Sequence, residues 1–465
     1  MKSTLFTCSL SSLGLLSLGL FAVGYAPAAS AVALTVVADG LSNPRGLSFG
    51  PDGSLYVSEP GIGGNGNCQP SPSTLFQPIC AGNSGSYLKI APDGTRTTLF
   101  DGFQSMAEQP SGNQGAGLQD LKFDSSGNAY VLTGFAGYPG NRDLELNQLG
   151  EQAIIPPGQL ATFPPSPPEQ VLNTPNLAKL FRADLESGEL TPIFDFGQYE
   201  ITQNPDKGDI VTNPYALNIS GDRAFVTDAG GNSVYSIKLD GSEVDVVALP
   251  ENVISNPQLP PLPPGQEIPP GLVDIVSAPG EPLALSVQSV PTGNAVGPDG
   301  ALYVGEYSGF PYQEASSRIF RIGESGMPEI FADGFTQITD LTFDQQGNLL
   351  VLQFSDASQA QSPDITGLPG SLIRLAPDGT RTTLLAGGEG LVSAAGVAVS
   401  PEGEVFVTNQ AVGSGLGQVL RVDRVRAGAE PVPEPITGLS LSALLGGAWL
   451  KRKQRKQQEQ QAQQA

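Results

Sequence analysis

Short apolar stretches alternate with turn residues along most of the chain, in a pattern that recurs six times. In the clearest copies, Leu47 to Val57 and Val296 to Val304, two short apolar runs flank a Pro-Asp-Gly turn. Weaker copies keep the same order of apolar run, turn and apolar run, at 121–131, 217–226, 341–351 and 397–407. Period-2 apolar runs on either side of a tight turn predict β-hairpins with one buried face.

A second hairpin is predicted after the first in five of the six units. In the first unit, Tyr87 to Ile90 turns at residues 92–94 into Thr97 to Phe100, and residues 91–99 recur letter for letter at 376–384. The sixth unit lacks a fourth strand, and residues 34–40 resemble the strand that is missing. Because verbatim repetition indicates copies of one four-stranded unit, we predict an all-β, six-bladed β-propeller of the NHL or TolB-like type. The N-terminal strand would complete the last blade and close the ring.

Both ends of the chain carry features of export. Lys2, the apolar stretch Leu13 to Val23 and the small residues Ala29 and Ala31 predict a secretory signal peptide. The predicted organisation is a signal peptide at 1–31, a propeller at 32–426, a linker at 427–435, a hydrophobic membrane segment at 436–450 and a basic, Gln-rich tail at 451–465.

The C-terminal order of Pro433-Glu434-Pro435, an apolar run and the cluster Lys451-Arg452-Lys453 resembles the PEP-CTERM sorting signal of Gram-negative bacteria. The resemblance implies that an exosortase-type membrane enzyme recognises the Pro-Glu-Pro motif. A plain C-terminal membrane tether is the alternative. Since basic residues stay on the cytoplasmic side, both interpretations place the propeller in the periplasm or outside the cell.

The amino-acid composition limits the kinds of catalytic and metal site that the protein can contain. The chain has no histidine, which excludes His general bases, Ser-His-Asp triads and the common zinc and copper sites. A net charge of −23 makes nucleic acid an improbable partner. Cys68 and Cys80 are the only cysteines after the signal peptide, and an even pair in an exported protein predicts a disulfide. A thiolate metal site is the alternative, but it needs further ligands.

The propeller body also resembles a known family. Residues 43–59 (Asn-Pro-Arg-Gly-Leu-Ser-Phe-Gly-Pro-Asp-Gly-Ser-Leu-Tyr-Val-Ser-Glu), the Gly-rich stretch 61–66 and Cys68 are similar to the ScyD/ScyE family of cyanobacteria. Members are exported propeller proteins associated with production of the indole-alkaloid sunscreen scytonemin. The resemblance implies a pathway rather than a reaction, because it supplies no catalytic motif that can be transferred residue by residue.

Polar residues occupy one equivalent position in all six units, two residues after the central Val. They are Glu59, Thr133, Asp228, Glu306, Gln353 and Asn409. A ring of oxygen-bearing side chains near the channel could hold a hard cation such as Ca²⁺, which takes six to eight oxygen ligands. Glu59, Asp228, Glu306 and Asn409 are the candidate metal ligands. The alternative is that these residues cap turns or face water.

A second candidate set lies where the first strand of each unit begins. It comprises Arg45, Asp120, Asn213, Asn294 and Asp340, of which Asp120 and Asp340 share one position. A comparable position supplies ligands in calcium-dependent lactonases and related six-bladed hydrolases, which motivates an enzyme alternative. Loop aromatics, Tyr307 and Tyr312 among them, could stack on a flat indolic ligand, or could pack their loops onto the blades.

These observations favour an exported binding or assembly platform for an indolic small molecule or for pathway proteins. Its candidate ligand-binding residues are Arg45, Asp120, Asn213, Asp340, Tyr307 and Tyr312. The alternative is a calcium-dependent propeller hydrolase, lactonase or lyase, and a purely structural envelope component is a third interpretation. The lack of histidine and of a recognised catalytic motif favours a non-enzymatic role over an enzyme.

Overall fold

The computed structural model describes residues 32–71, 74, 77–150, 166–260, 274–362 and 364–423. The predicted signal peptide, the Pro433-Glu434-Pro435 motif, the hydrophobic segment and the basic tail lie outside these residues. In the part of the chain described, no helix is both long and apolar enough to cross a bilayer.

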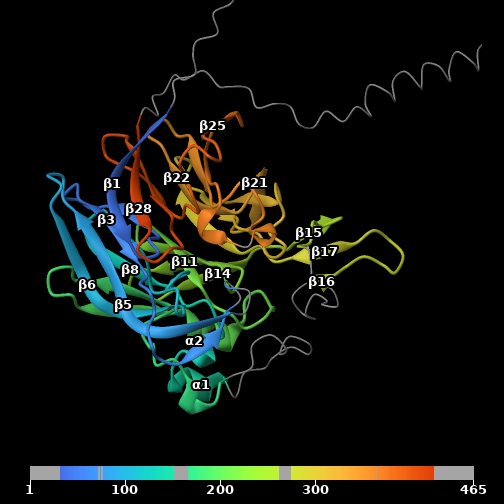
Figure 1. Cartoon of the computed structure of the whole chain (residues 1–465), viewed down its shortest axis with the longest axis horizontal. Coiled ribbons are helices and arrows are strands. Elements are labelled where there is room, and N and C mark those ends of the chain that lie inside the picture. Colours follow the sequence, from blue (N-terminus) through green and yellow to red (C-terminus); the bar gives the residue numbers. More distant parts are fainter. Residues whose placement is uncertain are drawn as a thin grey trace, which may run out of the picture. The chain divides into compact units, whose positions relative to one another are not determined.

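The described residues form an all-β fold of antiparallel sheets with few helices, as the hairpin pattern predicts (Figure 1). Six sheets follow one another along the chain and are numbered here in that order. Sheet 1 holds β2 (Leu47–Phe49), β3 (Leu55–Glu59), β4 (Cys68–Pro70), β5 (Pro78–Ile90) and β6 (Arg96–Glu108). Sheet 2 holds β7 (Leu118–Phe123), β8 (Ala129–Thr133), β9 (Lys179–Ala183) and β10 (Leu190–Asp195). Sheet 3 holds β11 (Pro214–Ser220), β12 (Arg223–Asp228), β13 (Ser233–Lys238) and β14 (Val244–Ala248).

The other three sheets repeat this order. Sheet 4 holds β18 (Pro291–Val296), β19 (Leu302–Glu306), β20 (Ser317–Ile322) and β21 (Pro328–Phe335). Sheet 5 holds β22 (Ile338–Phe343), β23 (Leu349–Gln353), β24 (Ser371–Leu375) and β25 (Arg381–Leu385). Sheet 6 holds β26 (Val397–Val399), β27 (Val405–Asn409), β28 (Gly417–Asp423) and β1 (Ala33–Leu41). The insertions form a small sheet of β15 (Asn252–Ser255), β16 (Asp274–Ile275) and β17 (Ala284–Val287), and the helices α1 (Leu144–Gly150) and α2 (Phe196–Gln203).

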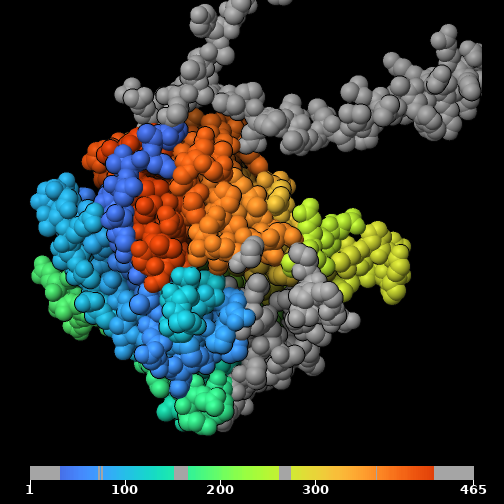
Figure 2. Space-filling model, in the orientation of Figure 1, coloured from blue at the N-terminus to red at the C-terminus, as the bar shows by residue number. Residues whose placement is uncertain are grey.

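The first strand of the fold completes the last sheet. β1 pairs antiparallel with β28, with Leu34 opposite Val422 and Val36 opposite Leu420. In the space-filling view the blue N-terminal strand lies directly against the red C-terminal strands (Figure 2). The predicted pairing of the N-terminal strand with the last hairpin is therefore confirmed.

The first strands of the six sheets, called inner strands below, contact one another in cyclic order: β2, β7, β11, β18, β22, β26 and again β2. A side chain reaches across every junction to the backbone next to it. Going round from sheet 1, these bonds are Ser58 to Gln119, Leu217 to Asp120, Thr227 to Thr292, Thr292 to Ile338, Thr339 to Ala394, and Thr408 to Arg45. The cycle is thus held by hydrogen bonds as well as by packing.

Glycine is required where inner strands approach most closely. A Cβ on Gly396 would lie 2.4 Å from the carbonyl oxygen of Arg45, and one on Gly293 would lie 2.3 Å from the Cα of Asp340. Neither neighbour is a flexible side chain. These two positions therefore set how tightly sheets 6 and 1, and sheets 4 and 5, can close together.

Candidate functional site

In each of the six numbered sheets, the second strand ends in a polar residue. These are the six residues that the sequence analysis selected: Glu59, Thr133, Asp228, Glu306, Gln353 and Asn409. In five sheets this side chain accepts a hydrogen bond from the segment that leads into the inner strand of the same sheet. The donors are Ser42 N to Glu59 (2.8 Å), Asn213 N to Asp228 (2.6 Å), Ser289 Oγ to Glu306 (2.8 Å), Thr336 N to Gln353 (2.8 Å) and Val392 N to Asn409 (2.6 Å). These five side chains act as clamps that fix where each inner strand begins.

The carboxylates of two fully buried clamps, Asp228 and Glu306, each accept several hydrogen bonds from protein donors. Asp228 accepts bonds from the Thr212 hydroxyl and from three backbone N–H groups. Glu306 is inaccessible to solvent and pairs with Arg318, with Nε 2.6 Å from Oε1 and Nη2 2.9 Å from Oε2. Burial raises the pKa of both carboxyl groups, against the effect of these donors, which stabilise the ionised forms.

This arrangement does not fit a calcium ring. Glu59, Asp228, Glu306 and Asn409 spend side-chain oxygens on protein donors. Within the described residues, no group of three or more Asp, Glu or Cys side chains is placed to hold a metal ion. The geometry therefore favours the turn-capping alternative at this position.

The starts of the inner strands form a different site. Four of these strands have a β-bulge there, between Leu118 and Asp120, Pro214 and Ala216, Pro291 and Asn294, and Ile338 and Asp340. A bulge redirects side chains and is frequent beside functional sites. Because each inner strand runs antiparallel to the second strand, its start lies beside the second strand's end and beside the loop that follows. We call this end of the cycle the channel mouth.

Two carboxylates lie at the channel mouth, on sheets 2 and 5. Asp120 accepts bonds from Leu217 N at 3.0 Å and from Lys122 Nζ at 2.9 Å. Asp340 accepts from Leu341 N and Val397 N, both at 2.8 Å. Each carboxylate therefore joins its own inner strand to the next one along the cycle.

Their environment favours the neutral acid at Asp340. Burial raises its pKa to about 7, and the charge of Asp120 adds to the rise, whereas Lys122 opposes it. The pKa of Asp120 is also raised by burial, but Lys122 is in direct contact and offsets part of the effect. Asp340 is thus a carboxyl group that changes charge near neutral pH without a paired cation of its own.

The charges of Asp120 and Asp340, and that of Arg45, all act on the pKa of Tyr215. Burial raises its pKa, Arg45 lowers it, and Asp340 and Asp120 raise it further. The same charge of Arg45 acts on Tyr307, whose pKa burial raises well above its ordinary value. Tyr215 therefore lies within electrostatic range of Arg45, Asp120 and Asp340, and Tyr307 lies within range of Tyr215 and Arg45.

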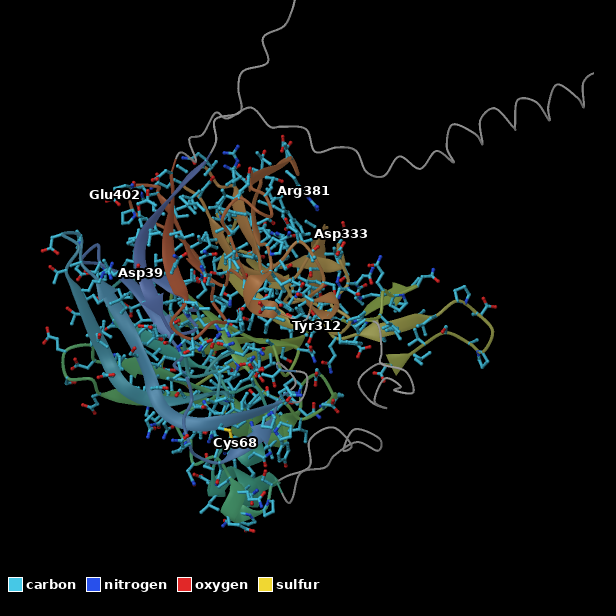
Figure 3. All side chains as sticks on the ribbon, in the orientation of Figure 1. Asp39, Cys68, Tyr312, Asp333, Arg381 and Glu402 are labelled. Carbon is cyan, nitrogen blue, oxygen red and sulfur yellow. A yellow bond between two sulfur atoms is a disulfide. The ribbon has the colours of Figure 1, made fainter. Side chains whose placement is uncertain are left out.

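Tyr307 and Tyr312 lie in the loop that follows β19, the second strand of sheet 4. Their rings are 5.8 Å apart in an edge-to-face arrangement, and Tyr312 is labelled in Figure 3. The Tyr307 hydroxyl donates to Gln359 at 2.5 Å and accepts from Gln337 at 2.6 Å. Tyr312 is only 9% exposed. The packing alternative therefore describes Tyr312, whereas Tyr307 is partly exposed.

Asn213 does not join this group. Its backbone N–H is held by Asp228 and its side-chain oxygen accepts from Phe135 N at 3.4 Å, between sheets 2 and 3. In its place the structure brings in Tyr215 and Lys122, which the sequence analysis did not select. Tyr215 stands two positions before Leu217, as Arg45 stands two before Leu47, and both apolar residues occupy the same place in the strand pairing. A stricter alignment of the repeats would have found it.

The cysteine pair is a disulfide. Cys68 and Cys80 face each other across the antiparallel pair β4 and β5 and are bonded, as seen at the yellow bond in Figure 3. The bond fixes the loop after β3 to the long strand β5. Gly66 N and Ala81 N extend this pairing by hydrogen bonds to Ala81 O and Asn67 O. The thiolate alternative is excluded for this pair.

Comparison with known proteins gives fold similarity alone. No family model matches the chain, and no curated protein matches it. A gluconolactonase from Xanthomonas campestris is 13% identical over 85% of this chain and 91% of its own, with a TM-score of 0.42. The calcium-binding protein regucalcin from Agrobacterium tumefaciens is 11% identical over 84% and 94%, with a TM-score of 0.42. Virginiamycin B lyase from Staphylococcus aureus is 12% identical over 84% and 99%, with a TM-score of 0.39. At these values the likeness assigns no activity, ligand or metal to this chain.

Proposed function

We propose that the chain is an exported six-bladed β-propeller whose channel mouth binds a small aromatic ligand in an extracytoplasmic pathway like that of the ScyD/ScyE family. The six numbered sheets would be the blades. The observation that supports binding is the convergence of Arg45, Asp120, Tyr215, Asp340 and Tyr307 at one end of the cycle. Most of these side chains start from bulges on paired strands, so the site is built on rigid elements rather than on loops alone.

The test of binding uses the full chain and an indolic probe such as indole-3-acetate, followed by calorimetry and by the melting temperature. A ligand that binds only the folded state raises the free energy of unfolding by about 2.7 kcal/mol at one hundred times its Kd. The double variant Arg45→Gln with Tyr307→Phe should lose binding. Arg182→Gln, an exposed arginine that bonds Asn128 at 2.8 Å, is the matched control and should bind normally.

We also propose export and anchoring, on the sequence features at the two ends of the chain. We place the protein outside the cytoplasm, sorted or tethered through Pro433-Glu434-Pro435 and the hydrophobic segment. Fractionation of cells that express the whole chain tests this placement. Replacing Pro433, Glu434 and Pro435 by alanine should change the fraction in which the protein is found if an exosortase-type enzyme recognises them, and should leave it unchanged if the segment is a plain tether.

A second candidate function is acid–base catalysis by Asp340, in a propeller hydrolase, lactonase or lyase. The observation that favours it is a carboxyl group whose pKa is raised to about 7 by burial, with a further rise from the charge of Asp120. Calcium is not needed for that role. An activity supported by Asp340 as a base should rise through pH 7, disappear in Asp340→Asn and survive a chelator. A saturable calcium-dependent rise in melting temperature would instead favour a metal-dependent enzyme.

A further inference from the structure

Arg45 is unusual among the arginines of this acidic protein. Buried Arg142 and Arg318 pair with carboxylates, and exposed Arg96 and Arg182 make bonds of 2.7 and 2.8 Å to backbone or amide oxygens. Arg45 has no carboxylate partner, and its hydrogen bond to a backbone oxygen is long. Its Nη2 reaches Gly115 O only at 3.4 Å, its Nε is buried without a hydrogen bond, and no carboxylate of the described residues lies within 4.0 Å.

An unpaired, partly buried guanidinium in a chain with 46 acidic and 23 basic residues calls for an anion from outside the protein. Guanidinium geometry matches a carboxylate through two parallel N–H bonds. A dianion such as phosphate fits less well. The other cation at the channel mouth, Lys122, already bonds Asp120 and Leu47 O, each at 2.9 Å, and Asp120 and Asp340 would repel a second negative charge.

We propose that Arg45 binds the carboxylate of an aromatic acid at the channel mouth, with Tyr215 and Tyr307 lining the space for its ring. This inference rests on the proposed binding function and specifies its ligand class. The tyrosine hydroxyls stay neutral, because burial raises the pKa of both groups. They add no charge that opposes the ligand.

The carboxyl groups at the site make binding depend on pH. Asp120 is neutralised in part by Lys122, so Asp340 is the group whose charge changes near neutrality. Its neutral form tolerates a neighbouring carboxylate ligand and its ionised form repels it. The affinity for an aromatic acid should therefore fall as the pH rises from 6 to 8, whereas the affinity for a neutral analogue should not change.

The test compares indole-3-acetate with indole-3-acetamide, which have the same ring and differ in charge. At pH 6 the full chain should bind the acid at least about tenfold more tightly than the amide, the scale of a charge-assisted bond. Arg45→Gln should reduce that ratio to about one, and Arg45→Lys should retain part of it. Because the Arg45 side chain makes a single long bond, both variants should fold with an unchanged melting temperature.

The outcomes separate the two proposals. Equal affinity for acid and amide, unchanged in Arg45→Gln, would overturn the carboxylate assignment and leave aromatic binding standing. No binding of either probe at millimolar concentration would overturn both. A preference for the acid that Arg182→Gln abolished as strongly as Arg45→Gln would also overturn the assignment, because it would reflect overall charge. Asp340→Asn should keep the preference and lose its pH dependence.

Discussion

Replacing Asp340 with asparagine removes a carboxyl group that titrates near neutrality, and its effect on stability should grow as the pH rises. The folded-state pKa is about 7, whereas an unfolded aspartate has a pKa of about 3.9. Between these values the folded chain holds a proton that the unfolded chain has released. The free energy of unfolding therefore falls as pH rises through this window, by up to about 1.4 kcal/mol per pH unit.

From pH 5 to pH 8 this linkage costs the wild-type protein about 2–3 kcal/mol. Asparagine does not titrate, but its amide nitrogen cannot accept from Leu341 N or Val397 N, so one of two hydrogen bonds is lost at about 1 kcal/mol. At pH 5, about one unit above the unfolded pKa, the ionisation of the unfolded chain has already cost the wild type about 1.5 kcal/mol, and at pH 8 the cost is about 4 kcal/mol. After subtraction of the lost hydrogen bond, we expect Asp340→Asn to be more stable than wild type by about 0.5 kcal/mol at pH 5 and by about 3 kcal/mol at pH 8.

Urea unfolding at pH 5, 6, 7 and 8 measures the difference between the two proteins, in which the titrating groups that do not interact with Asp340 cancel. Asp101→Asn is the control, because Asp101 is exposed and makes no side-chain bond in the described structure. Its effect should be small at every pH. A stability difference for Asp340→Asn that is the same at pH 5 and pH 8 would refute the interpretation that burial holds this carboxyl group neutral.

Three further substitutions test the framework around the mouth. Arg318→Met should destabilise the fold by about 3–5 kcal/mol in urea unfolding, because it leaves the buried carboxylate of Glu306 without its cation. Adding Glu306→Gln should restore part of this stability. An equal loss of stability in the double variant would contradict the pairing. Cys80→Ser should cost about 3 kcal/mol, the loop-closure value for a separation of 12 residues, and reduction of the wild type should have a comparable effect; a melting temperature indifferent to reductant would count against it. Gly396→Ala should destabilise by about 1–3 kcal/mol because its Cβ meets Arg45 O, while Gly367→Ala, whose nearest neighbour is 3.5 Å away, should be nearly neutral.

The strands were predictable because their signals are local. Pro51-Asp52-Gly53 places glycine where φ is +75°, and the same turn recurs at Gly300 with φ of +78°. The pairing of β1 with β28 was also predictable, because the last unit lacked a strand and residues 34–40 had the composition of one. Position in a repeat therefore carried most of the information about the fold.

The chemistry of the site could not be predicted in the same way, because it depends on hydrogen-bond partners that do not occupy equivalent positions in the repeats. Glu306 and Asn409 occupy equivalent positions, as expected, but what they bind is fixed by the segment folded back against them: Ser289 and Arg318 for one, Val392 for the other. Repeat position alone could not distinguish a metal ligand from a clamp. Tyr215 occupies the position equivalent to Arg45, two residues before the apolar residue that pairs with the central Val, and was missed because Asn213 was assigned to the start of this strand instead.

The pairing of β1 with β28 also sets the order in which the molecule can be completed. β1 is synthesised first but can pair only after β28, the last strand, has been made. The Thr35 hydroxyl, for example, donates to the carboxylate of Asp423, 388 residues later in the chain. A chain truncated before Gly417 keeps β1 with an open edge, which is a template for pairing with another chain. Closure across such a sequence distance is slow compared with hairpin formation. Joining residues 423 and 32 by a short linker and opening the chain in the loop between sheets 3 and 4 would make sheet 6 contiguous in sequence, and would turn the slowest contact of the wild-type chain into a local one.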